Sequence, residues 1–115
     1  DELISALGLA IKPPRKTPGC KPGWHLYAAR IDFKMLGIPR TDMMEKLRDK
    51  GIGTQVHYIP VHLQPYYRER YGNASLPGAQ HYYEHTLSLP LSPAMTDEEA
   101  RRVVKEISII CGGKP

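Results

Sequence analysis

The densest group of side chains capable of chemistry lies between residues 55 and 67, which contain two histidines and three tyrosines. The imidazoles of His57 and His62 can donate or accept hydrogen bonds near neutral pH, and Tyr58 offers both an aromatic face and a hydroxyl group. The run follows a strand pattern and enters a loop, where a rigid scaffold commonly displays binding groups. A structural interpretation stays open as well, with His57 capping the strand, Tyr58 in the core and the prolines of the run shaping a turn.

A second group of histidines could present imidazoles to a metal ion. His81 and His85 stand four residues apart on a predicted helix, and His57 or His62 could complete a site. Against this interpretation, the segment has no acid or cysteine at ligand spacing. The general-base glutamate of a zinc-protease helix is also out of place, because Glu84 directly precedes His85. We therefore predict no metal site.

The usual signatures of catalysis by the chain's own residues are missing from the sequence. Neither Cys20 nor Cys111 has a sequence context that would lower the pKa of its thiol, and no serine lies in a Gly-x-Ser-x-Gly elbow. A glycine-rich phosphate loop is also absent. We predict no catalytic residue and no complete active site in these 115 residues.

The elements that must position these side chains alternate between helices and strands. Thr41 as an N-cap and Gly51 as a stop predict one helix, and alternating residues after Gly51 predict a strand that returns the chain to a sheet. Four prolines before Trp24 predict a connector. The first expected elements are a helix at 1–7, the connector at 8–23, a strand at 24–32 and a helix at 42–50. A strand at 51–58, helical turns at 66–71 and 79–85, and a strand at 86–90 follow.

The last helix has the clearest local signal. Thr96 and Glu99 have the spacing of a capping box, in which each side chain satisfies an unpaired amide of the other residue. An apolar stripe follows at helical spacing, until Gly112 and Gly113 end the helix. The stripe consists of Ala100, Val103, Val104, Ile107 and Ile110. The whole order predicts an α+β domain, with a small antiparallel or mixed sheet and helices packed on it.

Composition excludes several classes of protein. Apolar residues make up 41% and charged residues 24% of the chain, as in globular proteins, so it is neither disordered nor fibrous. The formal charge of +4 is scattered and no aromatic-basic motif accompanies it, which argues against nucleic-acid binding. No apolar run is long enough for a membrane span, and two cysteines do not form a disulfide framework. We expect a cytoplasmic protein without membrane or nucleic-acid partners.

Three blocks of the sequence together resemble the DegT/DnrJ/StrS family of sugar-nucleotide aminotransferases. They are Trp24-His25-Leu26-Tyr27, the segment Gly51 to Tyr67, and the closing block Leu87 to Glu98. The blocks occur in the family's order and span about residues 24 to 107. The resemblance implies a fold-type-I aminotransferase. A large domain then holds pyridoxal phosphate on a lysine, and a C-terminal small domain closes over the site.

The resemblance also implies what the whole protein does. It would transfer an amino group, usually from glutamate, to a keto-sugar attached to a nucleotide. The blocks look closest to enzymes of spore coat polysaccharide and pseudaminic-acid biosynthesis that aminate UDP-linked 4-keto-6-deoxy-hexosamines. His57, Tyr58, Ile59 and Pro60, with His62, would line the sugar-nucleotide pocket. No segment resembles the surroundings of the catalytic lysine or of its aspartate partner, so we expect these residues alone to bind no cofactor and to be inactive.

The resemblance also implies how the chain is divided into segments and which partners it has. Residues 1–23 would be the end of an interdomain helix and a connector, 24–111 the small domain, and 112–115 a tail. The partners would be the large domain of the same polypeptide, the nucleotide sugar, and a second copy in a homodimer. The start without methionine, already in helical spacing, favours this interpretation. The alternative is a stand-alone α+β module that binds a ligand or a partner without catalysis.

Overall fold

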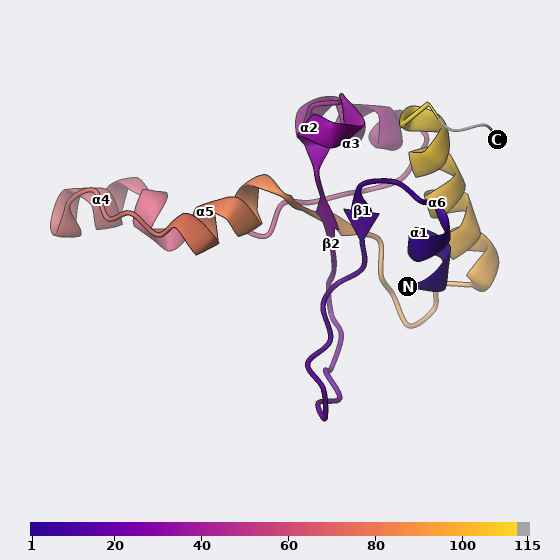
Figure 1. The fold of residues 1–115 in the computed structure, drawn as a ribbon, viewed down its shortest axis with the longest axis horizontal. Coiled ribbons are helices and arrows are strands. Elements are labelled where there is room, and N and C mark those ends of the chain that lie inside the picture. The colour runs from indigo at the N-terminus through magenta and orange to yellow at the C-terminus, as the bar shows by residue number, and fades with distance from the viewer. Residues whose placement is uncertain (113–115) are drawn as a thin grey trace.

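A three-stranded antiparallel sheet with helices packed against it forms the body of the computed structural model, which describes residues 1–112 (Figure 1). The strand order is β1 (Ile11–Lys12), β2 (Tyr27–Ile31) and β3 (Thr86–Leu89). The expected α+β class is confirmed, and the sheet is antiparallel rather than mixed. The helices are α1 (Glu2–Ala6), α2 (Phe33–Leu36), α3 (Arg40–Asp49), the 3₁₀ turn η1 (Val61–Leu63), α4 (Pro65–Tyr71), α5 (Pro77–Glu84) and α6 (Asp97–Ile110).

The register of the sheet separates an apolar face from an outer face. Ile11 lies opposite Ile31, and Ala29 lies opposite Leu87, so buried residues meet across both ladders. Because successive side chains of a strand point to opposite faces, their neighbours Lys12, Arg30, Thr86 and Ser88 lie on the outer face.

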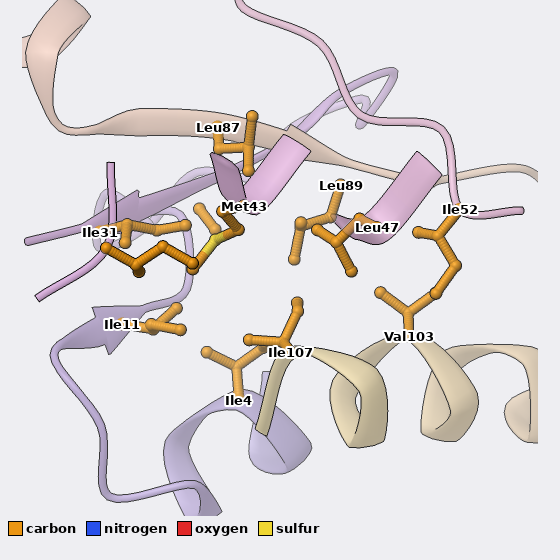
Figure 2. Close-up of a cluster of buried hydrophobic side chains, with 12 residues drawn as sticks. Ile4, Ile11, Ile31, Met43, Leu47, Ile52, Leu87, Leu89, Val103 and Ile107 are labelled. Carbon is orange, nitrogen blue, oxygen red and sulfur yellow. The ribbon is translucent and has the colours of Figure 1, made fainter. Parts of the chain in front are cut away.

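The core lies between the apolar face of the sheet and three helices (Figure 2). α1 contributes Ile4, α3 contributes Met43 and Leu47, and α6 contributes Val103 and Ile107. The predicted stripe on α6 is confirmed at its centre, where Ile107 is fully buried and Val103 is 8% exposed, whereas Val104 and the ends of the stripe are half-buried. The core thus brings α1, at the start of the described chain, into contact with α6.

The predicted capping box of α6 is confirmed. The backbone N–H of Glu99 donates to the Thr96 hydroxyl over 3.2 Å, and the N–H of Thr96 donates to the Glu99 carboxylate over 2.7 Å. The Thr96 hydroxyl also donates to this carboxylate, over 3.0 Å. The hydrogen bonds that the carboxylate accepts from the Thr96 backbone, first, and from the Thr96 hydroxyl, second, lower the pKa of Glu99.

The start of α3 differs from the prediction. The helix begins at Arg40 with Pro39 as its N-cap, so Thr41 lies in the first turn instead of before it. The Pro39 carbonyl accepts the first intrahelical bond from Met43 N–H over 3.1 Å, and the Thr41 hydroxyl donates to Asp42. Gly51 ends the helix as predicted, with a φ of 71° that a residue with a side chain rarely adopts.

Two short elements were missed. The Pro-rich stretch was expected to be only a connector, but Ile11 and Lys12 pair with β2 as an edge strand just before Pro13. The predicted strand at 24–32 is shorter and covers Tyr27–Ile31, and Phe33–Leu36 form a one-turn helix capped by Asp32. A two-residue strand and a four-residue helix are too short to show a period.

α4 and α5, residues 65–84, form an arm that joins the body at the start of β3, at the left of Figure 1. The helical turns predicted at 66–71 and 79–85 correspond to these helices. At the base of the arm, Arg40 donates to the carbonyl oxygens of Tyr83 and Thr86, and its guanidinium lies 4.7 Å from the centre of the Tyr83 ring. Several of the arm's large side chains are exposed: Tyr66, Tyr67, Tyr71, Leu76 and Tyr82. Within residues 1–112, no helix is both long and apolar enough to cross a membrane.

Candidate functional site

The segment that precedes the candidate histidines reaches the sheet at one point only. Gln55 exchanges two backbone hydrogen bonds with Ser88 of β3, over 3.1 and 2.8 Å, and this isolated bridge replaces the strand predicted at 51–58. That prediction is wrong because the end of α3 still holds Ile52, whose N–H donates to the Leu47 carbonyl over 2.9 Å. The alternation also fails at its end, since Tyr58 is 71% exposed while Ile52 is buried.

His57 lies against the outer face of the sheet through a side-chain contact to β3. Its Nδ1 atom is 2.8 Å from the hydroxyl oxygen of Ser88, a buried residue that is 4% exposed. The serine hydroxyl can donate to a neutral imidazole or accept from a protonated Nδ1, so the contact holds the ring in either tautomer. The Nε2 atom of His57 is thereby left as the ring nitrogen that can face a ligand.

The next two residues turn away from the body. Tyr58 is 71% and Ile59 is 54% exposed, and the Tyr58 ring meets the His57 ring edge-on with 4.7 Å between their centres. Pro60 caps the N-terminus of η1, and His62 lies half-buried within that turn. The expected binding segment therefore presents an aromatic and an aliphatic side chain to its surroundings beside a tethered imidazole.

A cavity of about 330 Å³ lies beside His57 and the bridge between Gln55 and Ser88. Of the expected site residues, all of which the structure describes, only His57 lines this cavity. Its lining does not include Tyr58, Ile59, Pro60 or His62. Its other walls come from the connector before β2, the bridge and β3. They are His25, Leu26, Gly53, Thr54, Gln55, Ser88, Leu89 and Leu91.

Sequence reasoning missed Ser88 and His25 as members of this site. Ser88 interrupts the apolar run of β3, and a polar residue within a buried strand is a usable signal, because buried hydroxyls need a hydrogen-bond partner. His25 gave no such signal, since its neighbourhood depends on how the connector before β2 folds back. With imidazole, amide and hydroxyl groups around it, the cavity can hydrogen-bond a polyhydroxylated ligand.

The histidine pair of the metal hypothesis lies elsewhere and has another arrangement. The rings of His81 and His85 are 4.1 Å apart between centres, and Nδ1 of His85 is 2.8 Å from the carbonyl oxygen of His81. Over residues 1–112, no three side chains of histidine, cysteine, aspartate or glutamate come together as a group that could hold a metal ion.

The lysines test whether these residues fit pyridoxal phosphate. A lysine that forms an imine with this cofactor is activated by desolvation or by a neighbouring cation. In the described chain every lysine is exposed, namely Lys12, Lys16, Lys21, Lys34, Lys46, Lys50 and Lys105. The described residues therefore do not fit the cofactor by themselves.

Comparison with known proteins gives consistent results. The model of the DegT/DnrJ/EryC1/StrS aminotransferase family matches residues 2–108. The spore coat polysaccharide biosynthesis protein SpsC of Bacillus subtilis is 44% identical over 93 residues, which cover 78% of this chain and 24% of that protein. The chain thus spans about a quarter of the length of the curated relatives it matches.

Solved structures resemble this fold over most of its length. S. venezuelae DesV, determined in complex with a ketimine intermediate, is 32% identical with a TM-score of 0.80, covering 99% of this chain and 30% of that one. Helicobacter pylori PseC, an aminotransferase involved in the biosynthesis of pseudoaminic acid, is 25% identical with a TM-score of 0.69, covering 76% and 24%. The expected resemblance is confirmed, and the chain belongs to the DegT/DnrJ/EryC1/StrS aminotransferase family.

Proposed function

We propose that these residues are the C-terminal small domain of a pyridoxal-phosphate-dependent aminotransferase that moves an amino group from glutamate to a nucleotide-linked keto-sugar in surface polysaccharide biosynthesis. The observation that carries the proposal is the family match over residues 2–108, nearly the whole chain. SpsC and PseC, which are named for polysaccharide and pseudoaminic-acid biosynthesis, favour a nucleotide-linked hexosamine as the acceptor. A UDP-linked 4-keto-6-deoxy sugar is the acceptor that we propose.

In this proposal, residues 24–111 form the small domain and residues 1–23 lead into it from the large domain of the same polypeptide. The large domain supplies the lysine for pyridoxal phosphate, whose ring withdraws electrons from the substrate when bound. That assignment agrees with the exposure of every described lysine here. The residues described here then act on the nucleotide sugar, in a cytoplasmic homodimer, and have no activity alone.

The role of this chain's own residues is to bind and orient the sugar. His57, held by Ser88 at 2.8 Å, offers its Nε2 atom to a sugar hydroxyl or a phosphate oxygen. Tyr58 and Ile59, exposed beside it, cover the sugar, while Pro60 and His62 fix the path of the chain into η1. Proline at this point lowers the conformational entropy that ordering on binding would cost.

The test uses the intact protein loaded with pyridoxal phosphate and measures the two half-reactions separately. His57→Ala and Tyr58→Phe should each lower kcat/KM for the nucleotide sugar. A hydrogen bond costs about 0.5–1.5 kcal/mol when lost, or up to about 3 for a charged partner, so the decrease is about two- to a hundredfold. Amination of the cofactor by glutamate should be unchanged, because that step involves no nucleotide sugar.

Tyr71→Phe is the matched control, because Tyr71 is 69% exposed in α4 and lies outside the proposed site. It should behave as the parent does. A loss confined to the glutamate half-reaction would contradict the assignment of His57 and Tyr58. If both variants matched the parent in the sugar half-reaction, these residues would have only a structural role.

A further inference from the structure

Two cations lie directly opposite each other on the outer face of the sheet. Lys12 of β1 pairs with Arg30 of β2 in the antiparallel ladder, and Arg30 is in turn opposite Thr86 of β3. Like charges at directly opposed positions repel each other and lower stability. Within the described chain, the one ion pair is between Lys16 and Asp1, so neither Lys12 nor Arg30 has an acidic partner there.

Two histidines lie near Lys12 and Arg30, where the arm joins β3. His81 and His85 stack at 4.1 Å between ring centres, next to the first residue of β3. The carbonyl oxygen of His81 can only accept, so Nδ1 of His85 must carry the hydrogen of their 2.8 Å bond. The Nε2 atom of His85 is therefore the nitrogen available to a ligand, and it becomes a donor when the ring is protonated.

All four basic side chains line one cavity of about 570 Å³. This volume lies within the range of small-molecule sites. The acidic residue in the lining is Asp32, whose Oδ1 atom accepts the backbone N–H of Met35 over 2.9 Å as the cap of α2. Apolar walls come from Leu9, Met35 and Tyr82. The cavity thus combines unpaired positive charge with surfaces that can contact a ring.

We propose that this cavity is a binding site for a diphosphate group. Arg30 presents a planar fork of donors suited to phosphate oxygens, and Lys12 adds a second charge from the neighbouring strand. A dianionic group between them would convert a repulsive cross-strand pair into a stabilising one. The exposed ring of Tyr82, 47% accessible at the cavity wall, could stack on a base that the diphosphate carries.

The site is separate from the His57 cavity but lies on the same face of the sheet. Thr86 lines the proposed site and Ser88 lines the His57 cavity, and these residues are two positions apart on β3, about 7 Å along the strand. The proposal needs no catalytic step. It is tested by binding alone and does not depend on the proposed transamination.

The experiment is isothermal titration calorimetry of inorganic pyrophosphate with the full chain at low ionic strength. Arg30→Gln and Lys12→Gln should each weaken binding about ten- to a hundredfold, as expected for the loss of a hydrogen bond to a charged group. Arg48→Gln and Lys105→Gln remove one exposed charge each, away from the cavity, and should leave the affinity within about twofold.

Each outcome decides the proposal. Unchanged affinity in the Arg30 and Lys12 variants, equal losses in the control variants, or no detectable binding by the parent would overturn it. Thermal melts without ligand give a second readout. Because each cavity variant removes a repulsive pair, its melting temperature should equal or exceed that of the parent, and a clear decrease would show that the pair has another partner.

A parallel titration with UDP distinguishes the source of the diphosphate. Affinity at least tenfold above that of pyrophosphate, lost in Tyr82→Ala, would identify a nucleotide, because a base stacked on an aromatic ring adds to the phosphate contacts. Equal affinities for the two probes would identify a free diphosphate.

Discussion

His57 is fixed to strand β3 through Ser88, whose hydroxyl oxygen lies 2.8 Å from its Nδ1 atom. Ser88 also exchanges two backbone hydrogen bonds with Gln55, two residues before His57. One buried residue thus holds both the backbone and the ring of the candidate site. A binding group fixed in this way loses less conformational entropy when its ligand arrives.

Removing the Ser88 hydroxyl should release the ring of His57. In the intact protein, Ser88→Ala should lower kcat/KM for the nucleotide sugar about two- to tenfold, since the variant loses about one neutral hydrogen bond. The glutamate half-reaction should not change. Ser5→Ala, at an exposed position of α1, is the control and should match the parent. An unaltered KM and kcat for the sugar in Ser88→Ala would show that the contact does not orient His57.

The same relationship shows what the sequence could and could not predict. Helices with local signals were predicted well: Thr96 and Glu99 mark the start of α6, and Gly51 marks the end of α3. Their caps and stops are formed by residues within one turn of each other. The contact of His57 with Ser88 joins residues 31 positions apart, and no local pattern encodes it.

The errors have the same origin. Alternation after Gly51 predicted a strand, but the N–H of Ile52 is bonded to the end of α3, and only Gln55 reaches β3. Ile11 gave no strand signal because its element has two residues. The direction of the arm was also unpredictable, since Arg40 sets it by binding carbonyl groups more than forty residues away.

The face of α6 that supports the sheet can be tested with two isoleucines of one helix. Ile107 is fully buried, whereas Ile109 is 39% exposed. Ile107→Asp should unfold the domain, because an unpaired buried charge costs several kcal/mol against a total stability of about 5–15 kcal/mol. Ile109→Asp should melt like the parent. Ile107→Val should still fold and lose about 0.5–1.5 kcal/mol of its free energy of unfolding. This milder variant allows the contribution of Ile107 to be measured, whereas an unfolded Ile107→Asp variant does not. Equal melts for all three variants in circular dichroism would contradict the burial of Ile107.

Two threonines test where the helices begin. Thr96→Ala should destabilise the domain by about 1 kcal/mol, because the Glu99 amide loses its acceptor at the N-cap of α6. Thr41→Ala should cost much less, because Thr41 lies inside the first turn of α3 and Pro39 is the N-cap. Urea unfolding of both variants measures the difference. A larger loss of stability in Thr41→Ala than in Thr96→Ala would show that Thr41 is the N-cap of α3.

The two cysteines should differ in their reaction with a thiol reagent. Cys20 is exposed in the connector, whereas Cys111 at the end of α6 is half-buried. Burial raises the pKa of the Cys111 thiol, and the nearby charge of Lys46 offsets this only in part. A raised pKa leaves less of the reactive thiolate at neutral pH, so Cys111 should react more slowly than Cys20. Raising the pH increases the thiolate fraction of Cys111, so its labelling rate should keep rising above the pH at which the rate of an ordinary thiol levels off.

Maleimide labelling followed by peptide mass spectrometry measures the rates of both cysteines, and the difference between them should vanish in denaturant. Faster labelling of Cys111 than of Cys20 in the folded chain would contradict the partial burial of the Cys111 thiol at the end of α6.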